Sequence, residues 1–170
     1  MKNWLRDKRV LWILSACIAC LLWAETAAAE HSAKPNVQII KADGMAEIAQ
    51  KGGEIDMADG SVTGGCTVDG GVFSLSGGTV QYMSQNEGDV RISGGSVTTD
   101  CRVAGGVFSV SAGTAASIIQ KSGMVNMTGD AVVTDYIMEA GTFDLSGGSV
   151  EHVRQTDGTI RMSGGTVMAA

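Results

Sequence analysis

Apolar and polar side chains alternate with a period of two along most of the chain, which indicates strands that bury one face. In residues 72–75, for example, the apolar Phe73 and Leu75 flank the polar Ser74. The same in-out-in pattern returns in every unit of an internal repeat. We expect the first apolar position of each strand to form one buried row, made by Ile55, Phe73, Val90, Phe108, Val125, Phe143 and Ile160.

The repeat units begin at glycines. The unit starts are Gly53, Gly71, Gly88, Gly106, Gly123, Gly141 and Gly158, so the unit length alternates between two values that differ by a single position. Ser-Gly-Gly runs such as residues 76–78 supply tight corners, because glycine adopts positive φ readily. A short unit repeated this often predicts an all-β fold, a single-stranded β-solenoid (β-helix) with about 17–18 residues per coil and about seven to eight coils.

Two further inward rows follow from the pattern. We expect one at Val62, Val80, Val97, Ala115, Val132, Val150 and Val167. We expect a less regular one at Val68, Met83, Val103, Ile118 or Ile119, Ile137 or Met138, and Val153. Residues 53–170 are thus the repeat domain. Residues 30–52 are interpreted as a linker followed by a degenerate first coil or cap, in which Val37 and Ile39 alternate like the first row.

Glutamine recurs once in every second unit, at Gln50, Gln85, Gln120 and Gln155. If these side chains point inward, they would form an amide ladder that could support assembly; if they point outward, they are solvated. Serines and threonines beside the corners are interpreted as partners of nearby backbone groups. The alternative is a hydroxyl-rich face for glycan attachment or surface binding.

Two cysteines of the repeat region, Cys66 and Cys101, are likewise two units apart. If one unit makes one coil, they lie two rungs apart, at about 9.6 Å, which is too far for a disulfide. Tyr136 occupies the equivalent third site, which predicts an exposed or roomy corner.

Residues 1–29 have the pattern of a secretory signal peptide, with a basic start, an apolar stretch over 10–24 and small residues before Glu30. An uncleaved anchor and a lipoprotein signal modified at Cys17 are the alternatives.

Cleavage before Glu30 leaves 8 basic and 16 acidic residues. An acidic chain argues against nucleic acid as a partner. No membrane span is expected after cleavage, and the compartment is extracellular space, cell surface or periplasm.

Residue patterns for catalysis or for ligand chemistry are missing from the sequence. The two histidines, His31 and His152, stand in no metal-ligand or Ser-His-Asp spacing. The units vary in length by a single position and leave no loop that could build a cleft. We therefore expect no enzyme, no cofactor and no metal. A left-handed β-helix transferase would need a regular hexapeptide repeat, which the sequence lacks.

The run Gly70–Val80, with the pattern Gly-Gly-x-x-x-Leu-Ser-Gly-Gly-Thr-Val, resembles the short repeats of AIDA-type self-associating autotransporter adhesins. The resemblance covers about residues 53–170 and implies a β-helical passenger that takes part in cell–cell or cell–surface adhesion. A weaker similarity to curlin repeats lies in residues 46–52 and 116–123, which follow an Ala-x-Ile-x-Gln pattern.

The function expected from the sequence is an exported, non-enzymatic structural or adhesive solenoid of the cell surface or extracellular matrix, as in a bacterial biofilm. Its partners are other copies of itself or cell-surface components. A periplasmic or surface glycan-binding module is the alternative. The strand at residues 159–162 is as regular as the internal ones and no cap is visible up to Ala170. We therefore expect end-to-end docking into filaments, against the alternative of a monomer kept soluble by its charge.

Overall fold

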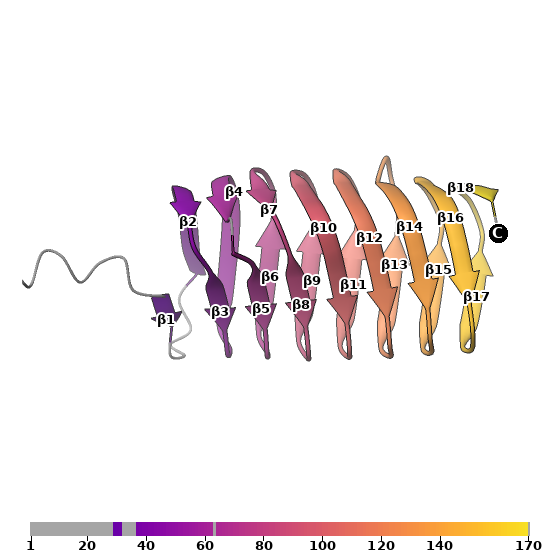
Figure 1. The fold of residues 1–170 in the computed structure, drawn as a ribbon, viewed down its shortest axis with the longest axis horizontal. Coiled ribbons are helices and arrows are strands. Elements are labelled where there is room, and N and C mark those ends of the chain that lie inside the picture. The colour runs from indigo at the N-terminus through magenta and orange to yellow at the C-terminus, as the bar shows by residue number, and fades with distance from the viewer. Residues whose placement is uncertain (1–28, 32–36, 63, 170) are drawn as a thin grey trace, which may run out of the picture.

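The computed structural model describes residues 29–31, 37–62 and 64–169, and their regular elements are all β-strands. Figure 1 shows the strands stacked side by side as successive turns of one rod, with the C-terminal turn at one end. All strand pairs are parallel, and one sheet order links all 18 strands. The fold is therefore the predicted β-solenoid, with about seven turns.

The strands follow the corner glycines closely. In the first half they are β1 (Ala29–His31), β2 (Val37–Met45), β3 (Ile48–Gln50), β4 (Glu54–Val62), β5 (Cys66–Val68), β6 (Val72–Leu75), β7 (Thr79–Val80), β8 (Met83–Gln85) and β9 (Asp89–Ile92). In the second half they are β10 (Ser96–Val103), β11 (Val107–Val110), β12 (Thr114–Gln120), β13 (Met124–Met127), β14 (Val132–Met138), β15 (Thr142–Leu145), β16 (Ser149–Gln155), β17 (Thr159–Met162) and β18 (Thr166–Ala169).

Each turn contributes to three parallel ladders. The first ladder runs through the start of β2 and β4, then β6, β9, β11, β13, β15 and β17. The second runs through the end of β4, then β7 and the starts of β10, β12, β14 and β16, to β18. The third runs through β1, β3, β5, β8 and the ends of β10, β12, β14 and β16.

The register of the first ladder shows that one sequence unit makes one turn. Ile55 pairs with Phe73, and Phe73 pairs with Val90, so each step along the ladder advances the chain by one unit. The predicted first row lies in the core: its members from Ile55 to Phe143 are at most 4% exposed. Ile160 belongs to the last turn and is half-buried.

Corner glycines let the turns stack at strand spacing. Gly106 has φ 73°, and a Cβ at this position would lie 2.1 Å from the carbonyl oxygen of Gly88 in the turn before. A side chain would therefore collide with the neighbouring backbone as well as strain its own. This close approach explains why the corners keep glycine.

One member of the predicted second row is wrong. Val133, not Val132, is the buried residue that pairs with Ala115 and Val150, while Val132 is 39% exposed. The corner after Met127 has one residue more than the corner after Leu75. Because successive strand residues face opposite sides, one extra residue moves the inward position by one.

The first coil shows a similar shift. We predicted Val37 and Ile39 at inward positions, but the backbone register pairs Gln38 with Ile55 and Ile40 with Met57. β2 and β3 pair with the turn that follows. The predicted signal segment lies outside the described residues except for Ala29, the first residue of β1.

The third predicted row is two rows in the structure. One contains Ile48, Cys66, Met83, Cys101, Ile118, Tyr136 and, half-buried, Val153. The other contains Gln50, Val68, Gln85, Val103, Gln120, Met138 and, exposed, Gln155. Ile119 and Ile137, the alternatives in the prediction, are half-buried positions between these rows.

Candidate functional site at the C-terminal end of the solenoid

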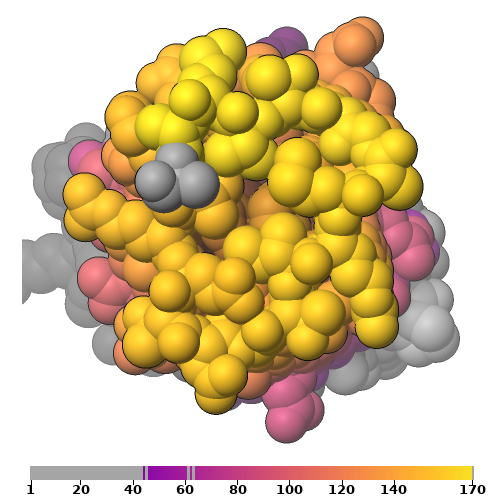
Figure 2. Space-filling view, turned by 90° about the vertical axis from the view of Figure 1, so that its right-hand side faces the viewer, coloured from indigo at the N-terminus to yellow at the C-terminus, as the bar shows by residue number. Residues whose placement is uncertain are grey.

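The core is closed along the rod and opens at the C-terminal end. There the structure has an apolar hollow of ≈ 430 Å³, lined by Phe143, Val153, Ile160, Met162, Val167, Met168 and Ala169. Figure 2 looks onto this end and shows the depression at the centre of the last turn. All seven lining residues are apolar, so water that fills the hollow meets hydrophobic surface.

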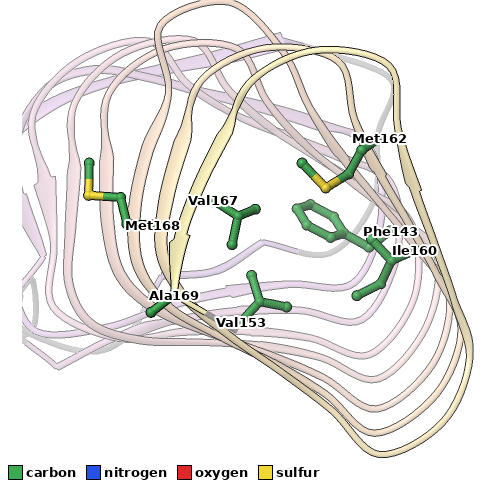
Figure 3. A pocket seen from close by; sticks show the side chains of 7 residues that line it. All are labelled: Phe143, Val153, Ile160, Met162, Val167, Met168 and Ala169. Carbon is green, nitrogen blue, oxygen red and sulfur yellow. The ribbon is translucent and has the colours of Figure 1, made fainter.

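Each ladder presents its inward position to this hollow. Figure 3 shows Val153, Ile160 and Val167 pointing into it from β16, β17 and β18, above the ring of Phe143. Met162 also points inward yet is 54% exposed. Met168 lines the hollow as well and is 68% exposed. In the turns before, the residues at the Met162 position are fully buried, as Leu145 and Met127 are.

The strand edges at this end are also open. Among the described residues, β17 pairs only with β15, and β18 pairs only with β16. The end of β16, Val153–Gln155, pairs with β14 but has no strand on its other side in the described part of the chain. The end therefore combines apolar surface with free backbone donors and acceptors, the two features of a strand-docking surface.

Three of the four regularly spaced glutamines lie inside the core, and Gln155 in the last turn is exposed. Gln50, Gln85 and Gln120 are at most 1% exposed. Val68, Val103 and Met138 separate them along the row, so the amides do not form the continuous ladder that the inward alternative required.

Each buried amide instead joins three turns through the backbone. Nε2 of Gln85 donates to the carbonyl oxygen of Gly88 at 2.6 Å and to that of Val107 at 3.0 Å. Gln50 and Gln120 make the same two bonds, to residues 3 and 22 positions later. Gln155 keeps only the first bond, to Gly158 at 2.8 Å, because the described chain offers no residue for the second.

The row that contains Cys66 and Cys101 is buried, so the exposed alternative of the predicted exposed or roomy corner is wrong. Cys66, Cys101 and Tyr136 are all 0% exposed, and the two cysteines are unbridged. Met83 lies between the cysteines in the register. Burial raises the pKa of the Cys66 thiol to about 12, and burial with the nearby charge of Asp100 raises the pKa of Cys101 further.

Hydroxyl side chains beside the corners bond to the adjacent turn. Ser76 Oγ donates to Asp56 Oδ1 at 2.9 Å, and Thr114 Oγ1 donates to Ser96 Oγ at 2.9 Å. Thr99 and Ser122 donate to backbone carbonyls of the turn before. These bonds match the interpretation of the hydroxyls as corner partners.

The surface offers few groups for ligand chemistry. His152 lies 3.6 Å from Asp135, and both side chains are more than half exposed. No group of three or more potential metal ligands occurs among the described residues. Tyr136 is buried, so Tyr82 is the one aromatic side chain with surface exposure in the described part of the chain. The described residues also contain no helix able to cross a membrane.

The sequence did not indicate which side chains line the hollow. Met162 and Met168 stand at positions that hold buried or polar residues elsewhere, and only the register of the last turn shows their exposure. Comparison of the chain with protein families, curated proteins and solved structures finds no match.

Proposed function

We propose that this protein is an exported, non-enzymatic structural or adhesive solenoid that works outside the cytoplasm and associates with itself end to end. Its role is that of a fibrous component of a cell surface or extracellular matrix. Other copies of the same chain, or components of that surface, are its partners.

The apolar hollow at the C-terminal end carries this proposal. An end that exposes Ile160, Met162 and Val167 together with unpaired strand edges gains free energy when another solenoid end covers it. Repeat proteins that stay monomeric usually cover such ends with polar caps. A contact between two different ends does not close on itself and so continues into a filament.

Other features of the chain agree with a scaffold. The inward positions hold packed apolar side chains and buried amides, and the outward hydroxyls that bond do so within the corners. Residues 1–29 have the pattern of a signal peptide, which supports work outside the cytoplasm.

The proposal is tested in two arms. Cells that express the full chain are fractionated, and protease accessibility on intact cells reports surface exposure. The purified chain from Glu30 onward is examined by sedimentation over a range of concentrations. Surface exposure with concentration-dependent association supports the proposal; a chain that stays in the cytoplasm overturns the exported role.

A further inference from the structure

We infer that the C-terminal end of one copy docks on the N-terminal end of a second copy, and that the last turn of the first and β1 of the second together make one complete turn. The inference rests on the proposed end-to-end association and adds its partner surface and register. It starts from the shapes of the two ends of the rod.

The two ends are incomplete in complementary ways. At the C-terminal end, β17 and β18 extend the first and second ladders by one turn, and the third ladder stops at β16. At the N-terminal end, β1 extends the third ladder by one strand beyond β3, and the described residues give it no companion in the other two ladders. The two ladders extended at the C-terminal end and the one ladder extended at the N-terminal end together supply the three strands of a full turn.

The register fixes which residues meet in the third ladder. Ala29 pairs with Ile48, and Ile48 stands in the row that ends at Val153. In the joint, the backbone of Glu30 and His31 of the second copy would therefore lie beside Arg154 and Gln155 of the first.

The first ladder continues in the same way, because Val37 of β2 pairs with Glu54, the position of Thr159 in the last turn. In the joint, the carbonyl of Val37 takes the place that Val72, Val107 and Thr142 take for the internal glutamines. Gln155 would then make the second hydrogen bond that it lacks in the single rod. The joint thus completes both the core and the amide pattern.

The experiment compares chains that start at Glu30 by sedimentation velocity. Val167→Asp places a carboxylate in the hollow and should abolish association. Thr166→Asp is the matched control, because it adds the same charge on the same strand at an exposed position that does not line the hollow.

A mixing experiment distinguishes docking from misfolding. The Val167→Asp chain keeps its N-terminal end and should cap filaments of the parent chain, so one variant for nine parent chains limits them to about ten copies on average. If the Val167→Asp chain associates as the parent does, the joint is wrong while self-association stands. If the Val167→Asp chain does not shorten parent filaments, the joint is also wrong. A parent chain that is monomeric at all concentrations overturns the joint together with end-to-end association, and the fractionation result then decides the exported role separately.

Discussion

The hydroxyl of Tyr136 donates a hydrogen bond to Oε1 of Gln120 inside the closed core. The Tyr136 ring stacks on Phe143 with a centroid distance of 4.0 Å. The bond satisfies the acceptor of an amide whose Nε2 already bonds to two backbone carbonyls. Gln120 is therefore fully bonded at a site where an unpaired polar atom would be costly.

The equivalent positions 35 and 70 residues before Tyr136 hold cysteine in place of tyrosine. Cys66 follows Gln50, and Cys101 follows Gln85, at the same spacing as Tyr136 follows Gln120. The Oε1 atoms of Gln50 and Gln85 are buried without a hydrogen-bond partner, whereas Oε1 of Gln120 has one. The tyrosine thus stabilises the turn that contains it in a way that the cysteines do not.

Tyr136→Phe should lower the free energy of unfolding by about 1–3 kcal/mol, because it leaves a buried acceptor unpaired while the ring stack on Phe143 stays in place. Urea denaturation measures the change. Tyr82→Phe removes the same atom from a half-exposed ring and should have little effect. Equal stabilities of the Tyr136→Phe chain and the parent would show that the hydroxyl contributes nothing to the core.

Phe108→Ala should destabilise the solenoid by about 3–5 kcal/mol, since it opens a cavity in the middle of the rod where turns pack on both sides. Val107→Ala on the same strand is the control, because Val107 faces outward and is half-buried. Thermal and chemical unfolding of both variants measure the difference. A Phe108→Ala chain that unfolds with the parent would contradict the assignment of the first row to the core.

Cys66 and Cys101 should remain free thiols in the purified protein. They lie two turns apart with Met83 between them, so a disulfide would need the backbone to move. Mass spectrometry of the non-reduced chain should show no crosslink, and a thiol reagent should react only as the chain unfolds. A Cys66–Cys101 crosslink, or rapid labelling of the folded chain, would contradict this register or the burial of the row.

The free energy of unfolding should fall as the pH rises above about 9. Burial raises the pKa of the Cys66 thiol from 9.0 to about 12, and it raises the pKa of Cys101 as well. The thiols stay protonated in the fold but ionise in the unfolded chain, so unfolding releases protons. Each thiol lowers the free energy of unfolding by up to about 1.4 kcal/mol per pH unit until its folded pKa is reached.

Urea denaturation between pH 8 and 10 (about one unit either side of the thiol pKa in the unfolded chain) measures this slope. The double variant Cys66→Ala, Cys101→Ala should be less stable at neutral pH but should lose most of the slope. The two thiols should contribute equally in this range, because burial holds both folded pKa values well above pH 10. An unchanged slope in the double variant would show that other groups cause the alkaline loss.

The periodic part of the sequence was sufficient to predict the solenoid and its core. The in-out alternation around Phe73 and Phe108 repeats once per unit, and so do the glycines at the unit starts. Both patterns therefore give the turn length that the strand register shows. The prediction of inward positions failed where the strand register is shifted by one residue. The longer corner before Val132 turned an expected inward residue to the opposite face, and β2 enters the backbone register one residue away from the expected positions.

Burial of the polar members of the core could not be settled from their residue types. Glutamine is a residue type that usually lies on the surface. The burial of Gln85 is favourable only because the carbonyls of Gly88 and Val107 accept hydrogen bonds from its amide. The prediction for Tyr136 failed for a related reason, because its partners Gln120 and Phe143 come together only in the folded turn. The complementary ends depend on pairing between distant strands, which periodicity alone does not give.

Cryo-electron microscopy of the chain that starts at Glu30 would show whether copies stack end to end. The first ladder has one position per turn, at Gln38, Ile55, Phe73, Val90, Phe108, Val125, Phe143 and Ile160. At about 4.8 Å per turn, these turns predict filaments one solenoid wide with an axial repeat of about 38 Å per copy. Filaments with a different repeat, or single rods under all conditions, would contradict the account.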